Sequence, residues 1–172
     1  MMQNFTNEPI DIAALPRYES VNLNKLHSKY WKVILINIIL VYTIITASAV
    51  LGVIFIEELA DKGLILGFLI VLVLFFTLFF AKVSFNKRGF AFREHDVIFR
   101  KGIISTNTMV IPYNRVQHVA VHEGFVSRFF GLAKVEIFTA GGFSSDLEIP
   151  GILKEEAENI KQLLMGKIQK QL

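Results

Sequence analysis

The chain has 172 residues, of which 53% are hydrophobic, so it has room for a pair of membrane helices and one small folded domain but not for two such domains. Lys and Arg number 18 against 15 Asp and Glu, and this small excess lies mostly next to apolar segments, which argues against nucleic-acid binding. The sequence has no cysteine, which excludes disulfides, thiolate metal sites and a cysteine nucleophile.

Residues 1–30 are expected to form a polar N-terminal segment on the cytoplasmic side. They contain Pro9, Pro16 and scattered charges, and no apolar stretch begins early enough to suggest a cleavable signal peptide. We therefore expect the first apolar helix to act as its own insertion signal. The chain up to about Asn24 should be extended or loosely packed, and residues 25–32 should lead helically into the membrane. A spacer without a function of its own is the alternative.

Residues 31–81 contain two long apolar runs, at 33–56 and 64–81, joined by a short polar connector at 57–63. The first run has no charged residue and as a helix would reach about 36 Å, more than the roughly 30 Å hydrocarbon core of a bilayer. The second would reach about 27 Å, and Lys82 at its end can extend its amine towards the headgroups. We predict an antiparallel transmembrane hairpin. A buried hairpin of a soluble helical domain is disfavoured, because core helices rarely lack charge over such a length.

Basic residues flank the outer ends of the hairpin, whereas its connector is mainly acidic. Under the positive-inside rule this asymmetry predicts a multi-pass membrane protein with both termini in the cytoplasm. The flanking residues are Lys25, Lys29, Lys32, Lys82, Lys87 and Arg88, and the charged connector residues are Glu57, Glu58, Asp61 and Lys62.

Small and polar residues are few within the two predicted helices. Ser48 and Gly52 in the first, and Gly63 and Gly67 in the second, form small-xxx-small pairs on which the two backbones could approach closely. Asn37 is the one strongly polar side chain inside either run. A transport pathway normally has ionisable residues at mid-depth, so a transporter or channel subunit is disfavoured, and a homomeric pore would have to use Asn37.

From residue 82 to residue 172 the pattern changes to that of a small cytoplasmic domain. Apolar residues alternate with polar ones in short runs separated by turn signals, which predicts six or seven antiparallel strands arranged as a sandwich or partly open barrel. The expected strands include Val83 and Phe85, Phe90 and Phe92, and residues 97–99, 106–111, 116–122, 134–139 and 145–149. Pro150 and Gly151 should end the sheet.

Two helical segments are expected within this domain. Residues 124–131 are too apolar for a loop and too short for a long helix, so we expect one helical turn that packs its phenylalanines against the barrel. Residues 154–171 have apolar side chains at spacings of three and four, which predicts an amphipathic helix that covers the barrel's open end. Ile160 and Leu164 lie on its apolar stripe and should be buried.

Four short motifs occur in an order that resembles the bacterial pleckstrin-homology-like membrane proteins (the YdbS-like family). They are IPYNRVQHV at 111–119, RFFGLA at 128–133, FTAGG at 138–142 and IPG at 149–151. The resemblance implies an α+β membrane protein with a PH-like fold, in which seven strands form a bent antiparallel barrel or sandwich capped by a C-terminal α-helix. It implies no shared catalytic residue or cofactor. It also suggests that small members are partners of larger relatives with repeated PH-like domains.

One departure from better-known PH domains limits what can be carried over. The turn at Lys87 and Arg88 is basic, but it lacks the dense basic cluster with which eukaryotic PH domains bind phosphoinositides. That ligand is therefore not transferred to this chain.

No residue pattern predicts a metal site, a cofactor or an enzymatic centre. His118 and His122 are four residues apart, but on a strand this spacing separates them by about 13 Å, too far for one metal ion. Gly141 and Gly142 precede neither a helix nor the lysine of a phosphate-binding loop, so we expect a hairpin turn or bulge there. The serines lack the sequence setting of a nucleophile.

Candidate partner-binding residues lie in the helical turn and before one strand. Successive helical residues point about 100° apart, so Phe125, Phe129 and Phe130 cannot all enter one core. We expect Phe129 or Phe130 to be exposed beside Arg128, a pairing typical of interface hot spots; a ring dipping into the lipid headgroups is the alternative. Arg115 is a candidate contact for an anionic ligand or a partner carboxylate, and otherwise would fasten its turn to a neighbouring strand.

Lys82, Lys87 and Arg88 are candidate contacts for lipid headgroups. They lie where the domain leaves the membrane, and a basic residue this close to anionic lipid can contribute about 1 kcal/mol. Alternatively, these charges only set the topology.

The sequence therefore predicts a non-enzymatic inner-membrane protein that presents a cytoplasmic PH-like domain for protein assembly. The expected partners are the bilayer and another membrane protein, possible examples being larger PH-like relatives; no nucleic acid is expected. An anionic-lipid-sensing module is the alternative, and a transporter or channel subunit is less favoured.

Overall fold

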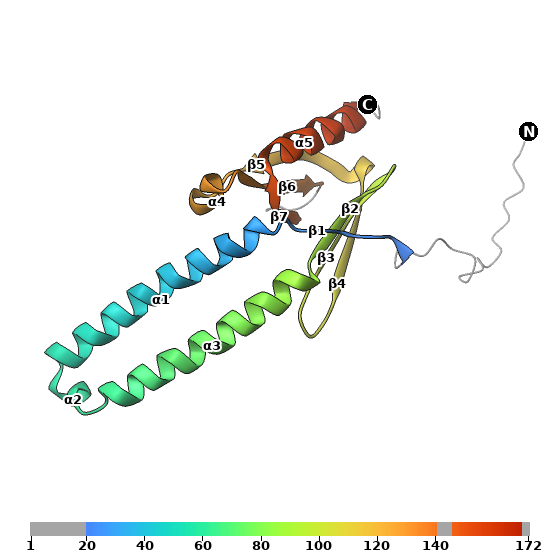
Figure 1. The fold of residues 1–172 in the computed structure, drawn as a ribbon. Coiled ribbons are helices and arrows are strands. Elements are labelled where there is room, and N and C mark those ends of the chain that lie inside the picture. The colour runs from blue at the N-terminus through green and yellow to red at the C-terminus, as the bar shows by residue number, and fades with distance from the viewer. Residues whose placement is uncertain (1–19, 141–145, 170–172) are drawn as a thin grey trace, which may run out of the picture.

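A long helical hairpin projects from a small domain of two β-sheets and a C-terminal helix (Figure 1). The computed structural model describes residues 20–140 and 146–169. This architecture confirms the predicted fold class, a hairpin of two membrane-length helices joined to an α+β domain.

The hairpin consists of α1 (Lys29–Phe55), a short helix α2 (Glu57–Ala60) in the connector, and α3 (Gly63–Lys87). Both long helices are long and apolar enough to cross a membrane, and their most apolar windows bury no side chain inside the protein. Apolar side chains that the protein itself leaves uncovered are suited to lipid, whose tails are as apolar as they are.

The strand expected at Val83 and Phe85 is wrong, because α3 continues as a helix through Lys87. The Phe85 ring lies 5.9 Å from the Trp31 ring of α1, measured between centroids. Lys82, one helical turn earlier, lies over the same indole. These contacts need residues three apart on one face, which a helix provides and a strand does not.

The first sheet contains four antiparallel strands in the order β1-β2-β3-β4. The strand β1, not expected from the sequence, comes from the segment before the hairpin and pairs with β2 along one edge. The lead into the membrane is helical only from Lys29, which corrects the expectation of a helical stretch at 25–32. The strands are β1 (Asn24–Lys25), β2 (Gly89–Phe92), β3 (Asp96–Lys101) and β4 (Asn107–Pro112).

A short 3-10 helix, η3 (Tyr113–Arg115), leads from the first sheet into the second. The second sheet is antiparallel in the order β5-β6-β7, and α4 (Phe125–Phe129) connects its first two strands as the expected single helical turn. Its strands are β5 (Val116–His122), β6 (Leu132–Thr139) and β7 (Leu147–Leu153).

The sheet does not end at Pro150 and Gly151, as expected, because β7 continues through both to Leu153. Gly151 adopts a φ of 69°, a conformation that residues with side chains rarely take. A Cβ at this position would lie 2.5 Å from Cγ of Tyr30. The glycine therefore lets the start of α1 approach β7 closely, and it fixes how the hairpin joins the domain.

The core lies between the two sheets and is closed by α5 (Lys154–Gln169), as predicted. Leu164 is fully buried, and Ile160 is half-buried against the core. The seven strands form two separate antiparallel sheets, which fits the predicted sandwich and is not a closed barrel.

Candidate functional site

The base of the hairpin is an aromatic and basic cluster. The amine of Lys82 lies 4.5 Å from the centroid of the Trp31 ring and 5.4 Å from that of Phe85. The Phe85 ring also packs near Tyr30. Aromatic rings with a neighbouring cation are typical of the membrane–water boundary, so this cluster marks where the hairpin enters the membrane.

The structure does not bring the three predicted headgroup residues into one patch. Lys82 covers Trp31, whereas the amine of Lys87 donates a hydrogen bond to the backbone oxygen of Ile103, at 2.6 Å. Arg88 is half-buried, and its Nε is buried without a hydrogen-bond partner among the described residues. Each residue therefore has a different environment.

Arg88 lines a polar cleft of about 500 Å³ beside the hairpin base. Within it, the Lys134 amine contacts Glu136 at 2.5 Å and Glu148 at 3.1 Å. Its hydrogen bond to Glu136, above all, raises the pKa of Lys134. The cleft is lined by Tyr30, Arg88, Phe99, Lys101, Lys134, Asp146, Glu148 and Pro150. Its charges are thus partly compensated by its own acidic residues.

Arg115 lines a second groove, of about 520 Å³, next to β4, the last strand of its sheet among the described residues. Its side chain is exposed and makes no hydrogen bond or ion pair with another described residue. Only its backbone oxygen fastens the turn, by accepting a hydrogen bond from the Ala140 amide. The other lining residues are Met109, Val110, Ile111, Pro112, Thr139 and Asp146.

Asp146 is the one acidic residue among the described residues that line this groove, and it is already hydrogen-bonded. Asp146 accepts hydrogen bonds from the amide and the hydroxyl of Thr139, at 2.8 Å and 2.6 Å. Both bonds stabilise the carboxylate and lower the pKa of Asp146. Arg115 is left as the charge that a ligand or partner could neutralise.

The exposed rings of α4 are Phe125 and Phe129, which are 81% and 75% exposed. They pack edge-to-face on each other, with centroids 5.4 Å apart. Phe129 confirms the expectation of an exposed ring beside the exposed Arg128, whereas Phe130 is half-buried. Sequence reasoning missed Phe125, although its spacing of four residues from Phe129 places both on one helix face.

The predicted partner-binding residues fall into two separate regions. Arg115 precedes β5 and α4 follows it, so the length of this strand, about 20 Å, lies between them. In Figure 1 the chain passes from β4 to β5 on the side of the domain away from the hairpin, and residues of this passage line the Arg115 groove, whereas α4 lies beside the first turns of α1.

A partly buried cluster that the sequence did not suggest stabilises the turn between β2 and β3. Arg93 donates a hydrogen bond from Nε to Asp96, and the Tyr113 hydroxyl donates to the Arg93 backbone oxygen, both at 2.6 Å. Burial, followed by the nearby charge of Asp96, raises the pKa of Tyr113 to about 12. The cluster joins the first sheet to η3 and is structural.

Nothing in the described part of the chain resembles a metal site. No group of three metal-ligating side chains is present there, and the His118 ring stacks on Phe138, with centroids 4.0 Å apart. The expected turn at Gly141 and Gly142 lies outside the described residues.

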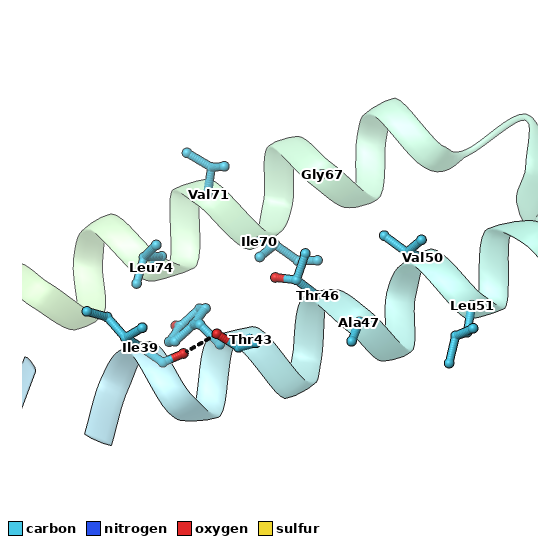
Figure 2. Close-up of a pocket in the computed structure, with 11 residues that line it drawn as sticks. Ile39, Thr43, Thr46, Ala47, Val50, Leu51, Gly67, Ile70, Val71 and Leu74 are labelled. Atoms are coloured by element: carbon cyan, nitrogen blue, oxygen red, sulfur yellow. Dashed lines mark hydrogen bonds between the residues drawn. The ribbon is translucent and has the colours of Figure 1, made fainter. Parts of the chain in front are cut away.

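A cavity of about 850 Å³ lies between α1 and α3, within the membrane-spanning part of the hairpin (Figure 2). Its walls are almost wholly apolar. The Thr43 hydroxyl donates to the backbone oxygen of Ile39, as Figure 2 shows, and Tyr42 is hydrogen-bonded to Thr77 at 2.7 Å. Asn37 does not line it. The described lining of this cavity has no Asp, Glu, Lys, Arg or His, so it lacks the mid-depth charges that a transport pathway normally has.

The glycines of the second helix have different surroundings. A Cβ at Gly63 would touch Val53 of α1 at 3.4 Å, so the helices are close near the connector. A Cβ at Gly67 would meet nothing within 4 Å, because Gly67 faces the cavity. The two helices therefore approach closely at Gly63, near the connector, but not at Gly67, the other glycine of the expected small-residue pair.

Comparison with known proteins gives a family and two relatives. The family model described as bacterial PH domain matches residues 12–168. The chain is 31% identical over 80 residues to the transmembrane protein YdbS of Bacillus subtilis (strain 168), covering 46% of this chain and 48% of YdbS. It is 35% identical over 83 residues to the transmembrane protein YdbT of the same strain, covering 46% of this chain and 17% of YdbT. No solved structure matches.

Proposed function

Because the chain belongs to the bacterial PH domain family, we propose that it is a non-enzymatic membrane protein that presents its PH-like domain for protein assembly. In this proposal the hairpin crosses the plasma membrane and the domain lies on the cytoplasmic side. The basic residues at the outer ends of the hairpin and the acidic connector support this orientation.

The observation that supports assembly is the groove at Arg115. The strand β4 is the edge of its sheet, and beyond it Arg115 has no partner among the described side chains. An extended segment of another protein could add to this edge through backbone hydrogen bonds and place a carboxylate on Arg115. The side chains of the added segment would pack on apolar groups of the groove such as Val110, which is partly exposed.

A larger relative is the partner that we favour. The two Bacillus relatives come from one strain, and stretches of similar length make up 48% of YdbS but 17% of YdbT. One strain therefore encodes a small and a large member. The larger protein has length for further domains, one of which could supply the added strand.

The test is site-specific photocrosslinking of the full chain in native membranes. A photoreactive residue at Val110 should crosslink to a larger bacterial PH domain protein, identified by mass spectrometry. The same residue at Leu163, which is exposed on α5, is the matched control and should give no such product.

Arg115→Glu should abolish the Val110 crosslink while leaving the melting temperature unchanged, because the Arg115 side chain is exposed. A crosslink that survives Arg115→Glu, or that appears equally from Leu163, would contradict the proposed site. Crosslinks to lipid alone would contradict protein assembly.

The second candidate function is sensing of an anionic lipid headgroup in the Arg88 cleft. Its specific support is the buried Nε of Arg88, which has no hydrogen-bond partner among the described residues and lies in a cleft that also contains Lys101. Retention of phosphatidylglycerol after delipidation should then fall in Arg88→Gln and with rising salt. Retention that depends on neither would argue against this function.

A further inference from the structure

The aromatic pair on α4, Phe125 and Phe129, is held outside the core by its surroundings. The Glu123 carboxylate, just before α4, contacts the Lys154 amine at 2.7 Å. The backbone oxygen of Gly131, just after α4, accepts a hydrogen bond from the Lys154 amide. Both ends of α4 are thus fixed to the start of α5, so the exposed rings cannot turn into the core without breaking these contacts.

This pair lies where the hairpin enters the membrane. Helix α4 contacts α1, and Figure 1 shows it beside the first turns of that helix. Val33, the first residue of the long apolar run and the one buried residue of α1, lies in these turns. The rings are therefore at about the level of the aromatic and basic cluster around Trp31.

A second exposed apolar side chain lies beside the other membrane helix. Ile104, in the loop between β3 and β4, is 97% exposed. The loop is tied to the end of α3 by the hydrogen bond from Lys87 to the backbone oxygen of Ile103. Figure 1 shows this loop beside the C-terminal end of α3, on the hairpin side of the domain.

We propose that the aromatic pair and Ile104 insert into the membrane leaflet on the domain's side and hold the domain in one orientation against it. The hairpin alone would attach the domain at its base and leave it free to tilt. The two apolar points lie on different sheets and beside different membrane helices, so contact at both would remove that freedom.

Continuity with the hairpin favours the membrane over a protein as the occupant. Each point is tethered to a helix that the membrane surrounds, so the apolar side chains reach the boundary without any movement of the domain. Phenylalanine is one of the residues that interfacial helices insert into a leaflet, and the exposed Arg128 beside Phe129 can contact a lipid phosphate. The inference does not rest on the proposed partner, because the Arg115 groove lies on the other side of the domain.

The experiment measures how deep each position lies, by fluorescence of the full chain in vesicles of phosphatidylethanolamine and phosphatidylglycerol. Trp31 is the only tryptophan and is replaced in the background variant Trp31→Phe. Single tryptophans are then introduced as Phe125→Trp, Phe129→Trp and Ile104→Trp. Leu163→Trp on α5, also exposed, is the matched control.

Brominated lipids should quench all three test tryptophans by several-fold more than the control, with blue-shifted emission. Test positions that are quenched no more than Leu163→Trp would overturn the proposal. Quenching at α4 but not at Ile104→Trp would overturn the two-point orientation. Blue-shifted but unquenched emission that requires an added membrane extract would assign the aromatic pair to a protein partner instead.

Discussion

The hairpin and the domain use the same apolar residue types, but different surroundings cover them. The large side chains of α1 and α3 are mostly exposed in the protein itself, whereas Val97, Ile98 and Val135 of the sheets are completely buried. In the hairpin, the length of each helix and its lack of charge are sufficient for it to be stable in the membrane, because lipid accepts almost any apolar surface. In the domain, each side chain must fit its neighbours, because protein interiors are close-packed.

The largest expected effect is the loss of a buried side chain from the domain. Leu164→Ala should lower the free energy of unfolding by about 2 to 5 kcal/mol, because Leu164 is fully buried under α5. Thermal unfolding of the full chain in detergent, followed by near-ultraviolet circular dichroism, measures the effect. The neighbouring Leu163→Ala, at a side chain that is 49% exposed, is the control and should change little. Equal effects at the two leucines would mean that α5 does not cover the core as described.

Tyr113 should make the stability of the domain depend on alkaline pH. Its folded pKa of about 12 lies above the ordinary value of 10.0, so the neutral phenol is favoured in the folded state. This contribution is fully present below pH 10 and is lost as the pH rises towards 12, a loss on the order of 2 to 3 kcal/mol. Tyr113→Phe should lose about 1 kcal/mol at neutral pH with its hydrogen bond to Arg93.

The measurement is denaturant unfolding of both proteins between pH 9 and pH 12, roughly the range in which tyrosine titrates. The stability difference between wild type and Tyr113→Phe should shrink and then reverse. Above pH 10 the phenol ionises in the unfolded wild type but stays neutral in the folded state, which favours unfolding, whereas phenylalanine does not ionise in either state. A difference that stays constant across this range would show that Tyr113 titrates at its ordinary pKa.

The smallest effect is expected inside the hairpin. Thr77→Val removes the hydrogen bond to Tyr42, yet polar contacts between membrane helices average only about 0.6 kcal/mol. The separation of spin labels on α1 and α3 should therefore remain unchanged in nanodiscs, with only a slight loss of resistance to denaturing detergent. Ser48→Val, away from this contact, is a matched control. A hairpin that opens in Thr77→Val would mean that its packing is as specific as that of the domain.

The sequence was most informative for the hairpin, since hydropathy does not depend on distant neighbours. It also placed β5 and the single turn α4 well, because alternation and a short apolar interruption are local signals. It failed where distant contacts decide the structure. The end of α3 is helical because Phe85 packs on Trp31, and β1 forms because a segment before the hairpin meets β2 after it.

The sequence predicted properties of single residues in the candidate site, but not where these residues lie relative to one another. Exposure of a ring beside Arg128 followed from helix geometry, whereas the position of α4 next to α1 depends on the tertiary fold. Lys82, Lys87 and Arg88 are close in sequence, and each was a candidate contact for lipid headgroups. On a helix end their side chains diverge, and each meets a different neighbour.

The central claim is that a membrane hairpin holds the domain on the cytoplasmic side, and labelling of single cysteines tests it most directly. The chain has no cysteine of its own, so a single introduced cysteine reports on which side of the membrane its position lies. Ala60→Cys tests the connector, and Leu163→Cys on α5 tests the domain. A membrane-impermeant maleimide added to intact cells should label Ala60→Cys at once and Leu163→Cys only after permeabilisation. Labelling of Leu163→Cys in intact cells, with Ala60→Cys protected, would contradict the account.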